Sequence, residues 1–158
     1  MIESELASIY EEIMWLAMRP NTTPSAARAW YTHVAAVRLS KKIRRFSGRV
    51  SRKSIEGGIE LRLEHFMRIQ TTLTKLIELH INNKRNDAEG FVKTVLECEQ
   101  VHIVTVEENY DAMKAKGDYN KAHIELIEWK DIEKEKQRLL WKTMLRGKVA
   151  NASDFKVE

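Results

Sequence analysis

Apolar residues along this chain recur mostly at intervals of three and four positions, which is the spacing of amphipathic helices. Only two prolines and six glycines occur among 158 residues, so few positions force a helix to end. The pattern predicts an all-α protein, a single-domain helical bundle of about five helices that spans residues 1–148. Residues 149–158 carry no such pattern, and we expect them to form a flexible C-terminal tail.

The first predicted helix covers residues 2–18. Thr23 and Pro24 then supply an N-cap and a proline at the first helical position, where a missing N–H costs nothing. The second helix can continue from there to about Phe46. Ser47-Gly48 either ends this helix through a left-handed cap or kinks it, because the amphipathic pattern continues beyond it.

The third predicted helix begins near Ser51 or after Gly57-Gly58, and it ends at the polar run 82–86. Asp87 can cap a fourth helix. β-branched residues occupy five of the six positions from 101 to 106, and they lower the helix propensity there. We therefore expect a break within this run.

Thr105 and Glu108 have the spacing of a capping box, which predicts a short helix from about 106 to 116. The last predicted helix covers about 121–146. Trp129 and Trp141 on this helix are candidates for a self-association surface, so the sequence allows a homo-oligomer.

The composition is that of a soluble globular protein, with 43% apolar and 32% charged residues. The single cysteine, Cys98, excludes an intramolecular disulfide framework and fits a reducing compartment. The acidic N-terminus lacks the pattern of a signal peptide, and no apolar run is long enough to span a membrane. These features predict a cytoplasmic protein that does not interact with membranes.

Charge is distributed unevenly along the chain. The net charge is +4, yet no acidic residue occurs between Glu12 and Glu56, and this segment holds ten Lys or Arg residues. A local field of one sign indicates an anionic partner more strongly than an evenly spread charge would.

On one continuous helix, at about 100° per residue, six cations of this segment share one face. They are Arg38, Lys41, Lys42, Arg45, Arg49 and Arg52. With Arg44 and Lys53 they form the predicted nucleic-acid-binding set, in which arginine forks match phosphate oxygens of DNA or RNA. Six phosphate contacts would give a log-log salt slope of roughly −4 to −5.

Two other interpretations of these cations remain open. Glu5, Glu11 and Glu12 of the first helix could neutralise the basic stripe by folding over it, in which case the charges would be a solvated face. Alternatively, the basic face could bind an acidic protein partner or a second copy of the chain.

Arg28 and His33 stand five positions apart in Arg-Ala-Trp-Tyr-Thr-His. This pair resembles the arginine–histidine signature of HEPN-type ribonucleases, which are all-helical proteins. The resemblance implies that Arg28 binds phosphate and that His33 acts in cleavage by the RNA 2′-hydroxyl. A packed, hydrogen-bonded histidine beside Trp30 and Tyr31 is the alternative.

Glu64, His65 and Arg68 lie within one turn of the third predicted helix. A carboxylate, an imidazole and a guanidinium so close together could form an acid–base site that also binds phosphate. Glu64 and His65 therefore join Arg28 and His33 as candidate catalytic residues of a metal-independent ribonuclease-like enzyme. A simple i,i+4 ion pair between Glu64 and Arg68 is the alternative.

Metal ligands are suggested at one place only. Glu99 and His102 match half of a di-iron carboxylate pattern, and Cys98 with His102 has a helical metal-ligand spacing. No second half and no further cysteine complete either site. We therefore expect neither a metal nor a cofactor.

Overall fold

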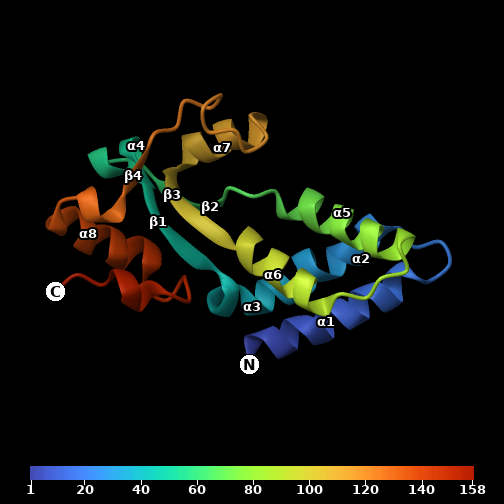
Figure 1. Ribbon diagram of the computed structural model, residues 1–158. Coiled ribbons are helices and arrows are strands. Elements are labelled where there is room, and N and C mark those ends of the chain that lie inside the picture. Colours follow the sequence, from blue (N-terminus) through green and yellow to red (C-terminus); the bar gives the residue numbers. More distant parts are fainter. The chain divides into compact units, whose positions relative to one another are not determined.

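The computed structural model describes all 158 residues of the chain. They divide into two compact units. The helical unit consists of residues 1–43 and 68–99, and the sheet unit consists of residues 44–67 and 100–158. Figure 1 labels the helices and strands of both units.

The helical unit contains five α-helices and one short π-helix, η1, which continues α2 into α3 (Figure 1). These elements are α1 (Ile2–Ala17), α2 (Pro24–Trp30), η1 (Tyr31–Ala35), α3 (Ala36–Ile43), α5 (Ile69–Asn82) and α6 (Ala88–Cys98). Within this unit α1 packs against α6, and α2 packs against α5.

Local hydrogen bonds explain where these helices begin. The Thr23 side chain accepts a hydrogen bond from the backbone N–H of Ala26 at 3.1 Å, and Pro24 occupies the first turn of α2. The Asp87 carboxylate accepts one from the N–H of Gly90 at 2.8 Å and caps α6. Both predicted N-caps are therefore confirmed.

The core of the helical unit is mostly apolar, and it includes buried polar side chains that pair with one another. Leu6, Ile13 and Ile77 are fully buried within it. The Tyr10 hydroxyl lies 2.6 Å from Nδ1 of His80, so each polar group satisfies the other. Burial lowers the pKa of His80, because the apolar surroundings disfavour the charged ring.

The sheet unit contains four strands and several short helices (Figure 1). The strands are β1 (Arg45–Ser51), β2 (Leu61–His65), β3 (Gln100–Thr105) and β4 (Leu126–Glu128). The helical segments are α4 (Arg52–Glu56), α7 (Val106–Lys114), η2 (Trp129–Asp131), α8 (Lys134–Leu140), η3 (Trp141–Leu145) and η4 (Ala152–Phe155). The strand order is β2-β3-β1-β4.

Strands β1 and β3 are parallel, whereas β2 pairs with β3 and β4 pairs with β1 in antiparallel fashion. Phe46 pairs with Val101 and Val50 pairs with Ile103, so the three residues between them on β1 lie opposite a single residue of β3. Gly48 occupies the middle of this β-bulge with φ +84°, a left-handed value that glycine adopts without strain.

The prediction of an all-α bundle is wrong, because the protein is mixed α/β. The β-branched run 101–106 was expected only to interrupt a helix, but it forms the sheet-centre strand β3 and the start of α7. The predicted last helix, 121–146, is replaced by β4, η2, α8 and η3. The predicted capping box of Thr105 and Glu108 at the start of α7 is confirmed.

The prediction of one long basic helix is also wrong. Helix α3 ends at Ile43, and residues 45–51 form β1. The left-handed glycine expected at position 48 is present, but it shapes a bulge in a strand and not the end of a helix. The cations from 38 to 52 therefore do not share one helical face.

Residues 149–158, predicted as a flexible tail, contain the short helix η4 and side chains that contact β1. Val149 is buried, and Phe155 in η4 packs edge-to-face on Phe46 with ring centroids 4.7 Å apart. The Asn151 side chain accepts from the N–H of Phe46 at 2.8 Å and donates to the C=O of Phe46 at 3.0 Å. This amide therefore pairs with β1 as a strand residue would.

We expect Asn151→Ala to lower the free energy of unfolding by roughly 1–3 kcal/mol, because it leaves two partly buried backbone groups of Phe46 without partners. Urea denaturation measures the change. Asn120→Ala, at an exposed position, is the control and should be close to neutral. Equal stability of the two variants would contradict the role of Asn151.

Candidate functional site

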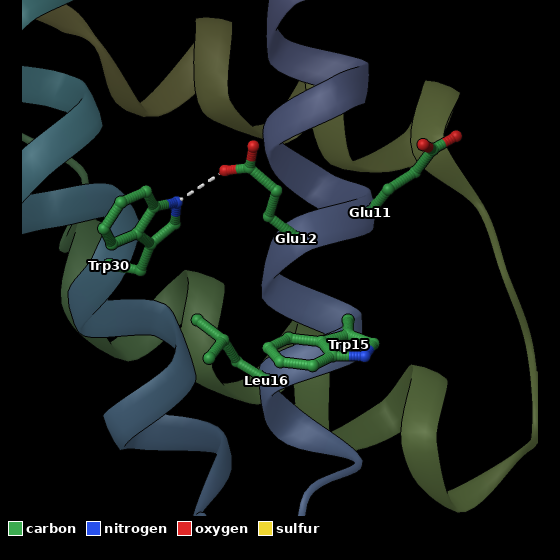
Figure 2. A pocket seen from close by; sticks show the side chains of 5 residues that line it. All are labelled: Glu11, Glu12, Trp15, Leu16 and Trp30. Atoms are coloured by element: carbon green, nitrogen blue, oxygen red, sulfur yellow. Dashed lines mark hydrogen bonds between the residues drawn. The ribbon is translucent and has the colours of Figure 1, made fainter.

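The helical unit carries an open groove of about 470 Å³ between α1 and α2 (Figure 2). Its lining residues are Glu11, Glu12, Trp15, Leu16 and Trp30, and we call it the tryptophan groove. Four of them lie on α1, and Trp30 is the last residue of α2. Figure 2 shows the Trp30 ring beside Glu12, with Trp15 and Leu16 about one turn further along α1.

Helix geometry explains why these tryptophans face outward. Helix α1 buries the stripe that includes Leu6, Ile9 and Ile13, and Trp15 lies about 200° around the helix from Ile13. Trp15 is accordingly 62% exposed. Trp30 is 38% exposed, although its neighbour Tyr31 is fully buried.

Polar contacts hold the groove in shape. The indole N–H of Trp30 donates a hydrogen bond to Oε2 of Glu12 at 2.9 Å, as the dashed line in Figure 2 marks. The guanidinium carbon of Arg19 lies 5.0 Å from the centre of the Trp15 ring, a cation–π distance. The carboxylates of Glu11 and Glu12 add negative charge at the rim, so the groove suits a ligand that is both apolar and cationic.

Further exposed apolar side chains lie at the end of α1 and on η1 and α3. Met18, the C-cap residue of α1, and Val37 of α3 are each 71% exposed, and Val34 of η1 is 49% exposed. With Trp15 and Trp30 they form what we call the apolar face of the helical unit. Isolated exposed apolar residues are common, but a group of this kind on adjoining helices is typical of an interaction surface.

The exposed tryptophans are not the ones that the sequence pattern predicted. Trp129 and Trp141, the predicted self-association candidates, are only partly exposed and pack against the core of the sheet unit. The indole N–H of Trp141 donates to the C=O of Ala152 at 2.7 Å. The sequence signal for the exposed ring is the position of Trp15 outside the apolar stripe of the first helix.

Arg28, the predicted phosphate ligand, is 8% exposed. Its guanidinium donates to the hydroxyls of Thr74, Thr32 and Ser25 at 3.2, 2.8 and 3.3 Å. His33, the predicted catalytic partner, is exposed. Arg28 is thus held by three hydroxyls that tie α2 to α5 and η1, a structural arrangement that accounts for its presence.

Glu64 and His65 lie on β2 and not on a helix. Successive strand residues point to opposite faces, so these two side chains do not lie on one helical turn as the sequence predicted. Arg68 occupies the N-cap position of α5.

The sheet unit instead brings Glu64 to other polar residues. Glu64 is 5% exposed and accepts a hydrogen bond from the Tyr119 hydroxyl. His102 is its direct partner on β3. Nδ1 of His102 lies 2.6 Å from Oγ of Ser47 in the bulge, and its ring stacks on Phe66 with centroids 4.4 Å apart. We call Ser47, Glu64, His102 and Tyr119 the sheet polar cluster.

Burial, together with the nearby Arg49 guanidinium, lowers the pKa of His102 to about 4. The Ser47 oxygen also accepts a hydrogen bond from the backbone N–H of Arg49 at 3.2 Å. A base with so low a pKa removes protons inefficiently at neutral pH. This geometry therefore favours a structural role for the sheet polar cluster.

The pKa of His102 predicts how stability depends on pH. Between about pH 6.5 and 4 the unfolded chain binds a proton at His102 that the folded chain does not, so stability falls as the pH falls through this window. His102 alone accounts for up to about 3 kcal/mol of this loss. Urea denaturation at about pH 7 and about pH 4.5 should show a smaller loss for His102→Gln than for the wild type. His33→Gln, the exposed control, should retain the wild-type loss.

Three of the six cations that were predicted to share one helical face have acidic partners. A guanidinium nitrogen of Arg38 lies 3.0 Å from a carboxylate oxygen of Glu5 in the helical unit. In the sheet unit, Arg49 lies 3.0 Å from Glu128 and Arg52 lies 2.7 Å from Glu125. Of the glutamates expected to cover the stripe, only Glu5 does so, and the other two acids come from β4 and the residue before it.

The other predicted nucleic-acid contacts are distributed over both units. Lys41 and Lys42 are exposed on α3, Arg45 is exposed on β1, and Lys53 is exposed on α4. Arg44 lies between α3 and β1 and is half-buried, and its Nε has no hydrogen-bond partner. Nucleic-acid binding stays a prediction, with fewer unpaired cations than the stripe would supply.

We expect binding of a single strand to have a log-log salt slope near −2, because three of the six cations remain unpaired and each phosphate contact contributes roughly −0.7. Fluorescence anisotropy with a labelled single-stranded oligonucleotide, measured over a salt series, gives this slope. A Lys41→Glu, Lys42→Glu variant should bind more weakly and with a shallower slope. A slope of about −4 would show instead that the ion-paired arginines release their carboxylates to bind phosphate.

The residues proposed as metal ligands do not lie on one helix. Helix α6 ends at Cys98, and His102 lies on β3. No three His, Cys, Asp or Glu side chains gather in an arrangement that could hold a metal ion.

The structure thus defines a two-unit α/β protein with a mixed four-stranded sheet and an exposed groove on its helical unit. No protein-family model, curated protein or solved structure matches the chain. None of its helices combines the length and the apolar character needed to cross a membrane.

Proposed function

We propose that this chain is a protein-interaction module whose tryptophan groove binds an amphipathic helix of a protein partner. The observation that supports this function is the exposure of Trp15 and Trp30 together on the walls of one groove. Large aromatic residues are enriched at the centres of protein interfaces. Burying the exposed part of such a ring contributes on the order of 2–3 kcal/mol to binding.

The charges of the groove indicate which helix it prefers. Glu11 and Glu12 line it, and a cation already lies over the Trp15 ring in the form of Arg19. A partner lysine or arginine could bind in the same manner, with its alkyl chain against an indole ring and its charge near a carboxylate. The favoured ligand is therefore a helix with apolar residues on one face and flanking Lys or Arg residues.

A synthetic helix of about four turns built from leucine and lysine is a direct probe of the groove. We expect it to bind at least about tenfold more tightly than the same helix with glutamate in place of lysine, because glutamate would face Glu11 and Glu12. Trp15→Ser should weaken binding of the lysine helix by about tenfold or more through lost apolar burial. Fluorescence anisotropy of the labelled peptides measures both effects.

Leu79→Ser provides a matched control, since Leu79 is 51% exposed on α5 and lies outside the groove. It should bind the lysine helix as the wild type does. Equal binding of the two peptides, or an unchanged affinity of Trp15→Ser, would contradict the proposed function.

A further inference from the structure

We infer that the protein partner of the tryptophan groove is a second copy of this chain, bound about a two-fold axis that crosses η1 and α3. This inference rests on the proposed function and identifies its partner. The occupant is the exposed side of the continuous segment α2–η1–α3, which is amphipathic and basic at its C-terminal end.

Four exposed side chains of this segment are spaced symmetrically along it. Trp30, Val34, Val37 and Lys41 are exposed and follow one another at intervals of four, three and four residues. Such intervals keep the four side chains on one face of a helix. Two copies that cross in antiparallel fashion between Val34 and Val37 would place valine against valine and Lys41 of each copy against Trp30 of the other.

Helical rise supports this pairing. Trp30 and Lys41 lie five to six residues on either side of the crossing point, which corresponds to about 8 Å along α3 and somewhat less along the π-helical turn of η1. A two-fold axis at that point brings Lys41 of each copy to Trp30 of the other, so both contacts form at once.

Charge is complementary at the same positions. Glu12 accepts the indole N–H of Trp30, so a carboxylate lies beside the ring that Lys41 of the other copy would reach. Lys41 is exposed and has no ion pair of its own, whereas Arg38 on the same helix is already paired with Glu5. The contact would add a cation–π and an ion-pair interaction at each end of the interface.

Two contacts within the helical unit define the direction of α1 relative to the α2–η1–α3 segment. Glu5 contacts Arg38, and Glu12 contacts Trp30, so α1 runs antiparallel to the α2–η1–α3 segment. The acidic groove is therefore at one end of the segment and Lys41 is at the other. Each copy carries both halves of the interface, which is the requirement for a closed dimer.

Sedimentation of the full chain tests the dimer. We expect the wild type to dimerise with micromolar affinity, whereas Val37→Glu should be monomeric, because it places two carboxylates near the axis. The side chain of Val37 is 71% exposed, so the variant should fold. Leu79→Glu, on α5, is the matched control and should dimerise as the wild type does. Circular dichroism confirms that the compared variants are folded.

A charge exchange tests the contact itself. Glu12→Lys and Lys41→Glu should each dimerise at least about tenfold more weakly, since each brings like charges together at both ends of the interface. Mixed in equal amounts, the two variants should form a heterodimer, because every Lys then meets a Glu. A dimer of either single variant as tight as the wild type, or a mixture that stays monomeric, would overturn this pairing.

Failure of the inference is distinguishable from failure of the proposed function. A wild-type chain that stays monomeric up to roughly a hundred micromolar yet binds the leucine–lysine helix would retain the function and lose the second copy as the partner. A monomer that does not bind this helix would lose both. Co-sedimentation of a monomeric wild type with phosphatidylglycerol vesicles, abolished in Val37→Glu, would instead assign the apolar face to a membrane surface.

Discussion

The parallel pairing of β1 with β3 is the constraint on which the arrangement of the chain depends. Two parallel strands cannot be joined by a tight turn, so the chain must travel a long way between them. Here residues 52–99 make that connection. They contribute β2 to the sheet and then α5 and α6 to the helical unit, which is why each unit is built from two separate stretches of the chain.

The same pairing decides what becomes of the basic segment. Once residues 45–51 are a strand, Arg49 lies directly opposite Glu128 of β4, and the two form an ion pair. Arg52 binds Glu125 through two hydrogen bonds. Exposed pairs of this kind contribute little to stability, but they reduce the charge available to an outside anion. On α3, by contrast, Lys41 and Lys42 remain unpaired, and they adjoin an apolar face with an acidic groove. This combination favours a protein partner over a phosphate backbone.

Features set by neighbouring residues could be predicted, whereas features set by distant ones could not. The N-caps at Thr23 and Asp87 and the capping box at Thr105 depend on hydrogen bonds within three residues, and all three were predicted. Strand β1 was not, because Phe46 and Val50 also fit a helical spacing of four. Its hydrogen-bond partners lie on β3 and β4, more than 50 residues away, and no local pattern identifies them. Glu64 was selected as a site residue on the assumption of a helix, and the strand places it with His102 and Tyr119 instead.

By itself the sequence determined several helix starts, the single free thiol and the local excess of positive charge, and it gave the left-handed glycine at position 48 as one of two alternatives. These properties follow from short-range sterics and composition. Only the tertiary structure decided which elements are strands, which arginines are neutralised and which tryptophans are exposed. Exposure depends on what packs against a side chain from elsewhere in the chain, and so Trp15 and Trp30 form a groove while Trp129 and Trp141 pack against the sheet-unit core.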